Sequence, residues 1–217
     1  MKKIIQNITS QPKTKEELRV LIEAEIKKFG VQCDLNHIDI SLVTDFSFLF
    51  CNSYFNGDIS RWDVSSVTHM DSMFFKSKFY GDISKWNVSG VMYMDGMFCG
   101  SQFNGNVLGW NVSGVSDMCS MFADSKFNGD ISKWDVSKVT NMCSMFANSG
   151  FNGDFSNWVR SAIVVDEDIF LDSAVAKKLG IENPNLEQVK SHFLSLKLED
   201  DLLGDSPRQG GLGKVRL

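Results

Sequence analysis

The sequence predicts an α/β repeat fold, in which about five to six coils of 24 residues stack into a solenoid between helical caps. Closely similar strings of 20 residues begin at Phe55, Phe79 and Phe127. Tryptophan recurs every 24 residues from Trp62 to Trp158, and eight of the ten methionines occupy two positions of the same repeat. A repeat of this length can bury its apolar side chains only against neighbouring copies, so the copies are expected to stack.

An N-terminal capping helix is predicted within residues 1–30. The segment Thr14-Lys-Glu-Glu17 has the pattern of a capping box, which starts a helix. Apolar residues then recur every three or four positions, and Gly30 follows as a stop signal. We therefore expect an amphipathic helix over 15–29, whose apolar face covers the first coil.

Each copy of the repeat is expected to form one strand, one helical segment and one turn. The spacing Ile59-x-x-Trp62-x-Val64 is that of a leucine-rich-repeat strand. Apolar residues three and four apart between Val67 and Phe74 predict a helical or 3₁₀ segment. An Asn-Gly pair near the start of most copies favours a turn, because both residues readily take a positive φ. The expected fold class is therefore a leucine-rich-repeat-like solenoid with one short parallel strand in each coil.

The repeat extends beyond the most similar copies in both directions. Upstream, residues 31–54 carry apolar side chains at the positions that later copies use. Downstream, a sixth copy breaks off after Trp158. The predicted repeat domain is therefore 31–160, and atypical copies at its ends are what a stacked repeat needs to close its core.

The repeat also resembles that of a known family. The string "FNGDISKWDVSKVTNMCSMF", which begins at Phe127, is similar to the repeat of the BspA-like leucine-rich-repeat family. That repeat is common in bacterial surface proteins and lipoproteins, many of them of unknown function. The resemblance covers residues 31–158. It implies a solenoid with a binding or adhesive role, and it implies no catalytic residues.

The C-terminal region is predicted to form a helical cap over 161–203 and a flexible tail over 204–217. Helix-forming residues run from Asp172 to Leu179 and are followed by Gly180 as a stop signal. An Asn-Pro pair then opens a second stretch with helical apolar spacing. The tail that follows combines glycine, proline and mixed charge, which favours mobility.

The composition limits the partners that the chain is expected to bind. The excess of 27 acidic over 22 basic residues gives a net charge of -5, which disfavours nucleic acid and anionic membrane surfaces. No apolar run approaches the ~20 residues that span a bilayer, so no membrane insertion is expected. The first residues lack the apolar stretch of about 7 to 15 residues that a secretory signal needs, which predicts a cytoplasmic location. The alternative is a cell-surface or secreted location reached by a non-classical route.

No catalytic or metal-binding constellation stands out in the sequence. The three histidines are scattered, and no nucleotide-binding, hydrolase or zinc-protease motif is present. We therefore expect no enzymatic activity, no cofactor and no metal, while an enzyme without a recognisable motif stays an alternative. A row of stacked aspartates in the Asn-Gly-Asp turns could bind calcium, but Asn106 interrupts the row and a turn accounts for these residues.

The five cysteines are expected to be free thiols. Their odd number in a chain of 217 residues does not suggest a disulfide framework. Cys119 and Cys143 are one repeat apart and should lie about 5 Å from each other across neighbouring coils. That distance would allow a disulfide. Two packed thiols in a reducing cytosol are the favoured interpretation, and a disulfide stays open.

The candidate binding surface consists of polar residues between the apolar positions of the predicted strands. Side chains alternate along a strand, so these residues should line a concave outer face. In the middle copy, Leu108 and Gly109 replace a serine and a cation, which predicts a small apolar dent with a polar rim, as in many protein interfaces. The candidate residues are Arg61, Asp63, Lys85, Asn87, Leu108, Gly109, Asn111, Lys133 and Asp135.

These observations predict a non-catalytic protein–protein interaction module that binds through its concave strand face. The partner is expected to be a protein. The oligomeric state stays open, with a monomer favoured. One alternative is a surface-exposed or exported adhesin, whose partner would be a host protein or a glycan. A second is a structural spacer with a merely solvated face, since exposed ion pairs such as Arg61 with Asp63 contribute only about 0 to 1 kcal/mol. A third is an unrecognised enzyme.

Overall fold

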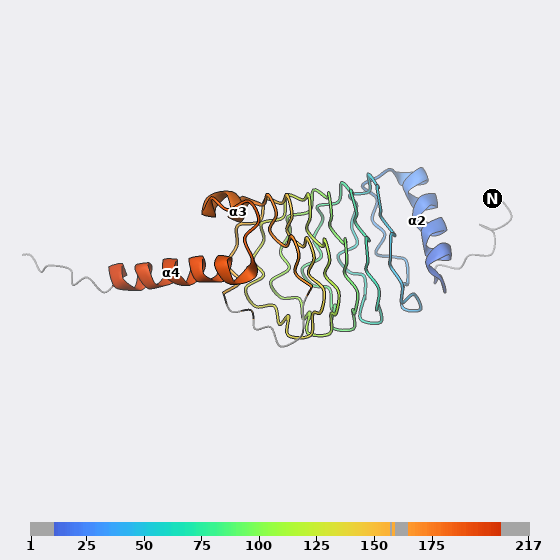
Figure 1. The fold of residues 1–217 in the computed structure, drawn as a ribbon. Helices are drawn as coiled ribbons and strands as arrows, with labels where there is room; N and C mark the ends of the chain where they lie inside the picture. Colours follow the sequence, from blue (N-terminus) through green and yellow to red (C-terminus); the bar gives the residue numbers. More distant parts are fainter. Residues whose placement is uncertain (1–10, 157, 159–164, 205–217) are drawn as a thin grey trace, which may run out of the picture.

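The computed structural model describes residues 11–156, 158 and 165–204. In this part of the chain, the 24-residue copies form coils that lie side by side in a row (Figure 1). Helices lie at both ends of the row. The coils are numbered in chain order: coil 1 is 31–54, coil 2 is 55–78, coil 3 is 79–102, coil 4 is 103–126 and coil 5 is 127–150.

Helix α2 (Lys15–Phe29) covers the first coil and begins and ends where the sequence predicts. Thr14 Oγ1 accepts the backbone N–H of Glu17 at 3.2 Å, which satisfies one free donor of the first turn. Gly30 ends the helix with a φ of 89°, a conformation that favours glycine. The apolar side chains of α2 pack against the core of the coils. The predicted helix over 15–29 is therefore confirmed.

Backbone hydrogen bonds join each coil to the next. Between coils 2 and 3, the N–H groups of Met70, Ser72, Phe74 and Lys76 donate to carbonyls of the following coil at 2.7 to 3.0 Å. The equivalent four bonds recur at the other coil interfaces of the described chain. Between them, the N–H groups of Met73 and Phe75 close turns within their own coil, onto Met70 at 3.2 Å and onto Ser72 at 3.1 Å. Successive copies are thus held in register by alternate residues.

The predicted fold class, an α/β leucine-rich-repeat-like solenoid with a strand in every coil, is wrong. The described residues contain three helices, all outside coils 1 to 5, and no strand or sheet. In place of a sheet there are isolated parallel bridges, such as the series Asp45, His69 and Tyr93. The expected strand cannot run straight, because the N–H of Trp62 bonds the carbonyl of Ile59 at 3.2 Å and closes a turn in its middle.

The predicted helical segment of each coil is also absent. In coil 2, Ser72 and Lys76 take φ values of 52° and 50°, which belong to the left-handed region. A right-handed helix cannot pass through such residues. Coil 3 has Gly96 and Gly100 at the same two positions, also with positive φ. The apolar residues spaced three and four apart, which suggested a helix, are therefore buried by a run of turns instead.

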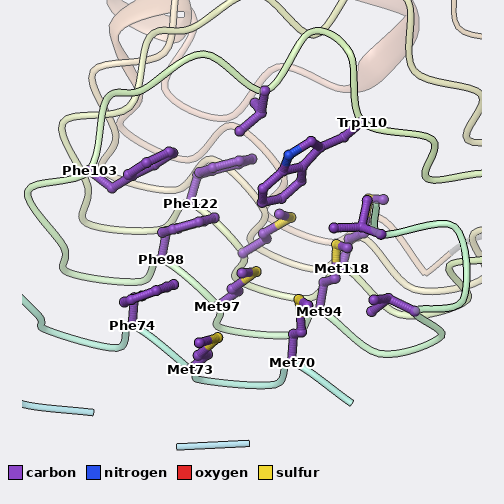
Figure 2. Packing of buried hydrophobic residues seen from close by; sticks show 14 of the residues in the cluster. Met70, Met73, Phe74, Met94, Met97, Phe98, Phe103, Trp110, Met118 and Phe122 are labelled. Carbon is purple, nitrogen blue, oxygen red and sulfur yellow. The ribbon is translucent and has the colours of Figure 1, made fainter. Parts of the chain in front are cut away.

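Two ladders of stacked phenylalanine rings run through the core. Phe74, Phe98 and Phe122 belong to one ladder (Figure 2), with ring centroids 5.5 and 5.7 Å apart and planes within 4° of parallel. The other ladder runs from Phe55 to Phe151 with centroid spacings of 6.2 to 6.5 Å. The eight repeat methionines are fully buried in the same core, so their predicted role in packing is confirmed.

Each repeat tryptophan links its coil to the preceding one. The indole N–H of Trp110, in coil 4, donates to the carbonyl of Ile83, in coil 3, at 3.1 Å. A buried indole needs such an acceptor for its single donor. The equivalent bonds, at 3.0 to 3.1 Å, are made by Trp62, Trp86, Trp134 and Trp158.

The stacking continues further along the chain than the sequence suggested. Phe170 lies 24 residues after Phe146 and stacks on it with 5.6 Å between ring centroids. Val165 likewise forms a parallel bridge with Asn141 of coil 5. The sixth copy, expected to break off after Trp158, therefore returns to the repeat register at residue 165.

Helices α3 (Ala174–Leu179) and α4 (Leu186–Gly204) lie at the far end of the row (Figure 1). The Ser173 side chain accepts the N–H of Ala176 and caps α3. Phe193 of α4 meets Phe155 edge to face, at 6.0 Å between centroids, and so covers the last apolar layer. Two helices are thus present where the sequence predicts them, and α4 extends away from the coils. The predicted tail lies almost wholly outside the described residues.

Candidate functional site

The outward side of the coils carries short turns in which a side-chain oxygen binds the backbone two residues later. Oδ1 of Asp58 accepts the N–H of Ser60 at 2.8 Å, and Oδ1 of Asp63 accepts the N–H of Ser65 at 3.1 Å. Aspartate and asparagine favour such turns because their short side chains reach this N–H. We call an aspartate and a serine joined in this way an Asp-x-Ser pair.

Most of these turns form two rows, because they recur at the same positions of successive coils. The first row comprises Asp58/Ser60, Asp82/Ser84, Asn106/Leu108, Asp130/Ser132 and Asp154/Ser156. The second row comprises Asp39/Ser41, Asp63/Ser65, Asn87/Ser89, Asn111/Ser113 and Asp135/Ser137. Asparagine preserves the turn without the charge, since Asn106 Oδ1 accepts the N–H of Leu108 at 3.0 Å.

The nine predicted binding residues lie on this outward side. All except the half-buried Leu108 are exposed. The position of Gly109 borders open space, since a Cβ there would meet no atom within 4 Å. Four of the nine also have a structural role, because they are turn residues of the second row: Asp63, Asn87, Asn111 and Asp135. Their part in partner binding stays a prediction.

Arg61, another predicted residue, pairs with a carboxylate of the preceding coil rather than with Asp63. Its Nη2 lies 3.6 Å from Asp34 Oδ2. Its backbone N–H donates to Asn36 Oδ1 of the same preceding coil at 2.7 Å. Arg61 thus helps to join coils 1 and 2, a role that the repeat pattern of the sequence did not reveal.

The N-terminal cap places a lysine on an Asp-x-Ser pair. Lys15 Nζ of α2 lies 2.7 Å from Asp45 Oδ2 and 2.6 Å from Ser47 Oγ. Asp45 Oδ1 keeps its bond to the N–H of Ser47 at 2.8 Å. Burial would raise the pKa of Asp45, but the hydrogen bonds from Lys15 and Ser47 outweigh burial and hold this pKa below its ordinary value.

The C-terminal cap repeats the same arrangement. Lys197 Nζ of α4 lies 2.8 Å from Asp154 Oδ2 and 2.6 Å from Ser156 Oγ. Asp154 Oδ1 again accepts the serine N–H, at 2.7 Å. The pKa of Asp154, which burial would raise, is held low by its hydrogen bonds to Lys197 and Ser156. Both caps are therefore anchored by an ammonium group on a turn of the coils.

A hollow of about 410 Å³ lies beside two further Asp-x-Ser pairs, in coils 2 and 3. Asp58, Ser60 and Asp82 contribute to its lining, and the other lining residues are Gln32, Asn56, Gly57 and Gly81. The backbone and hydroxyl of Ser60 donate to Asp58 and hold its pKa below the ordinary carboxyl value. Ser84 has the same effect on the pKa of Asp82. Both carboxylates are therefore anionic at neutral pH.

Two tyrosines stand close to this hollow in the chain and face solvent. Tyr54 is 72% exposed and Tyr80 is 65% exposed, more than any other large apolar or aromatic side chain among the described residues. Tyr80 immediately precedes Gly81 of the hollow, and its N–H donates to Asn56 Oδ1 at 2.8 Å. Sequence reasoning missed them. The available signal is that Tyr80 takes the position held by asparagine in coils 2, 4 and 5.

A larger hollow, of about 550 Å³, lies between α2 and coil 1. Its lining residues are Glu25, Lys28, Phe29, Cys33, Asp34 and His37. His37 Nε2 lies 3.6 Å from Glu25 Oε2, so the histidine is engaged with the cap helix. Burial raises the pKa of the Cys33 thiol, which makes it a weaker nucleophile at neutral pH.

Comparison with known protein families places the chain in one of them. The family model described as "Mycoplasma protein of unknown function, DUF285" matches residues 22–125 and, in a second match, residues 77–183. This chain belongs to the DUF285 family. The two DUF285 matches overlap, as expected for a repeat that can be aligned in more than one register. No curated protein and no solved structure matches the chain.

Other chemistry in this DUF285 chain is sparse in the part that the structure describes. There, no group of three or more His, Cys, Asp and Glu side chains is arranged to hold a metal ion. All five cysteines are free thiols, including Cys119 and Cys143, and burial raises the pKa of Cys119. No helix within the described ranges combines the length and apolar character needed to cross a bilayer.

Proposed function

We propose that this member of the DUF285 family is a non-catalytic protein-recognition module, which binds its partner through the outward side chains of its coils. One observation carries the proposal: the outward residues change from coil to coil while the core beneath them repeats. At one outward position, coils 2 to 5 present Arg61, Lys85, Gly109 and Lys133. The next residue is a buried tryptophan in every one of these coils.

Such an array suits recognition because the coils fix the spacing of the side chains that they display. Stacked repeats as a class use this property to build extended binding surfaces. The nine residues predicted from the sequence are the proposed contact surface, with Lys85 and Lys133 on either side of Leu108 and Gly109 in chain order. A rigid scaffold also limits the conformational entropy that binding would otherwise lose.

The cellular location is part of the proposal. A cytoplasmic module is one alternative, and an exported adhesin, which the resemblance of the repeat to BspA-like surface proteins favours, is the other. The two alternatives differ in where the partner is found. An adhesin would meet a host protein or a glycan outside the cell, and a cytoplasmic module would meet a protein of the same organism.

A capture experiment tests the function and the location together. The wild-type protein would be immobilised and exposed separately to a lysate of its own organism and to material from that organism's surroundings. The test variant is Lys85→Glu with Lys133→Glu, on the proposed face. The matched control is Lys126→Glu with Lys177→Glu, which makes the same change in net charge at two exposed lysines outside that face.

Loss of one partner with the test variant but not with the control is the expected result. All three proteins should melt within about 2 °C of one another, because exposed substitutions change stability little. Equal capture by both variants would mean that the proposed face is not the site. The sample that yields the partner distinguishes a cytoplasmic module from an exported one.

A further inference from the structure

The chain repeatedly uses its own nitrogen donors to occupy Asp-x-Ser pairs. In addition to the two cap lysines, the side-chain amide of Gln11 donates to Asp39 Oδ2 at 2.7 Å and to Ser41 Oγ at 3.2 Å. In all three cases, Oδ1 of the aspartate is bound to the serine N–H, at 2.7 to 3.1 Å. An external N–H donor therefore binds the second carboxylate oxygen and the serine hydroxyl together.

These three occupied sites show what an Asp-x-Ser pair does beyond forming a turn. The turn uses one carboxylate oxygen and orients the other oxygen and the hydroxyl toward the same incoming atom. An ammonium group has three donors around one nitrogen and can satisfy both acceptors at once. The two lysine nitrogens do so at 2.6 to 2.8 Å, the distances of charge-assisted hydrogen bonds.

Two Asp-x-Ser pairs beside the hollow of about 410 Å³ form the same turn as the occupied pairs. They are Asp58/Ser60 and Asp82/Ser84, which we call the open pairs. Their serine N–H groups donate to Oδ1 at 2.8 and 2.9 Å. None of the ion pairs formed among the described residues involves either aspartate. The open pairs thus repeat the geometry of the occupied ones without a bound ammonium from the described chain.

The charged side chains around the open pairs do not replace such a ligand. The side chain of Asn36 hydrogen-bonds Asp58, much as the Gln11 amide binds Asp39, but it is uncharged and brings no ammonium. The guanidinium of Arg61 is directed to Asp34 at 3.6 Å. Lys85 lowers the pKa of Asp82 from a distance, and it is exposed. Asp58 in turn raises the pKa of Asp82, so the two carboxylates repel each other. A cation between them would relieve this repulsion.

The exposed tyrosines add a second element of recognition. Tyr54 lies four residues before Asp58, Tyr80 lies two residues before Asp82, and both present most of their surface to solvent. The aliphatic stem of a lysine packs well on an aromatic ring, and its ammonium is attracted to the ring face. A carboxylate and a hydroxyl can hold the ammonium of a lysine, and an exposed tyrosine two or four residues earlier in the chain offers an apolar surface for its stem.

We propose that the two open pairs bind lysine side chains of the protein partner, in the way that the chain binds its own cap lysines. This inference rests on the proposed function, because it names the chemistry by which the partner is recognised. The partner is a protein segment that carries at least two lysines on one side. The spacing of the open pairs is one coil, about 5 Å for stacked backbone segments, which adjacent flexible lysines can span.

The test uses a defined probe, a fluorescein-labelled peptide of six alternating lysine and alanine residues with blocked ends. Fluorescence anisotropy at physiological ionic strength would measure its dissociation constant with the full chain. The test variant is Asp58→Asn with Asp82→Asn. The matched control is Asp130→Asn with Asp135→Asn, which changes the net charge equally at two pairs that lack a neighbouring tyrosine. Asparagine should preserve all four turns, as Asn106 and Asn111 do.

The expected result is at least tenfold weaker binding by the test variant and less than twofold weaker binding by the control. A peptide with acetylated lysine side chains should not bind, because it lacks the ammonium. Equal weakening by the two variants would overturn the inference, since it would reveal general attraction to an acidic protein. Failure of the wild type to bind the lysine peptide would also overturn it.

The outcome can be separated from that of the proposed function. If the peptide test fails while capture of the natural partner still depends on Lys85 and Lys133, the lysine inference is wrong and the recognition function stands. If capture also proves independent of those two residues, the proposed function fails as well.

Discussion

Replacement of Trp110 by alanine should destabilise the protein more than any surface change on the same coil. Its indole lies in the middle of the row of coils, with its ring centroid 6.3 Å from that of Phe98. Its N–H donates to the carbonyl of Ile83 at 3.1 Å, so the side chain both fills the core and joins two coils. Trp110→Ala removes both contributions, whereas Trp110→Phe removes the hydrogen bond and only part of the packing.

The magnitudes follow from these two contributions. Truncation of a buried tryptophan to alanine costs about 3 to 5 kcal/mol. The hydrogen bond accounts for about 1 kcal/mol of this, because the Ile83 carbonyl keeps its bond from the backbone N–H of Trp86 at 3.2 Å and is not left unpaired. The smaller ring of phenylalanine loses a further contribution of about 1 kcal/mol in buried apolar area. Trp110→Phe should therefore cost about 2 kcal/mol in total.

Urea unfolding followed by circular dichroism would measure both free energies, with thermal melting as a second assay. A loss of 1 kcal/mol lowers the melting temperature of a chain of this size by about 2 to 4 °C, so Trp110→Ala should lower it by about 6 to 20 °C. Lys126→Ala, an exposed change in the same coil, is the control and should stay within about 0.5 kcal/mol. If Trp110→Phe proved as stable as the wild type, the inter-coil hydrogen bond would not contribute as argued.

Three further predictions concern the turns, the caps and the thiols. Gly96→Ala should lower the free energy of unfolding in urea by about 1 to 2 kcal/mol, because Gly96 has a φ of 60° that alanine resists. An unchanged free energy of unfolding would contradict the turn geometry. The caps should loosen in acid. The native pKa of Asp45 and of Asp154 lies below the unfolded value of about 3.9. The stabilising contribution of these two carboxylates is therefore complete above that pH and is lost as the pH falls through the native pKa. Hydrogen exchange in α2 and α4 should then accelerate before that of the coils, and uniform acceleration would count against the anchoring role. Iodoacetamide should modify Cys33 slowly at pH 7 and faster at higher pH, because burial raises the pKa of its thiol. Mass spectrometry of the labelled peptides would measure the rate, and fast modification of Cys33 at pH 7 would contradict the prediction.

The period of the repeat was enough to predict the core. Residues that recur every 24 positions, such as Trp110 and Met118, are buried as expected. The helix over 15–29 was also predictable, because the signals that start and stop it are local: the Thr14 cap and Gly30. These features depend on which side chains are apolar and on short-range hydrogen bonds, and both can be read directly from a sequence.

The backbone conformation between the core residues was not predictable in the same way. Apolar residues spaced three and four apart indicate only that one side of the segment is buried. A run of turns satisfies that pattern as well as a helix does. Ser72 and Lys76, unlike the glycines of coil 3, give no sign in their residue type that they take a positive φ. The stacking of neighbouring coils imposes this conformation through the bonds of alternate N–H groups.

The candidate site was predictable only in part for a related reason. The sequence identified outward polar residues, but it could not show that Lys15 and Lys197 dock on turns 30 or more residues away along the chain. Those contacts depend on how the cap helices lie against the coils. The Asp-x-Ser pair therefore looked like a turn alone, and its second role as an acceptor of nitrogen donors became visible only where the caps occupy it.

The carboxylates of the Asp-x-Ser pairs carry a cost that asparagine would avoid. Identical carboxylates in neighbouring coils repel one another, as Asp154 does in raising the pKa of Asp130. Asparagine would serve the turn equally well without the repulsion, and it does so at Asn106, Asn87 and Asn111. A stacked repeat that needed only turns would thus lose nothing by using asparagine throughout.

At three Asp-x-Ser pairs, those met by Gln11, Lys15 and Lys197, the aspartate does bind a cation or another nitrogen donor. The open pairs keep two adjacent aspartates, Asp58 and Asp82, despite their mutual repulsion. The structural role of the turn does not require that charge. A positively charged ligand for the open pairs would account for it, and the asparagine variants remove this charge while leaving the turns in place.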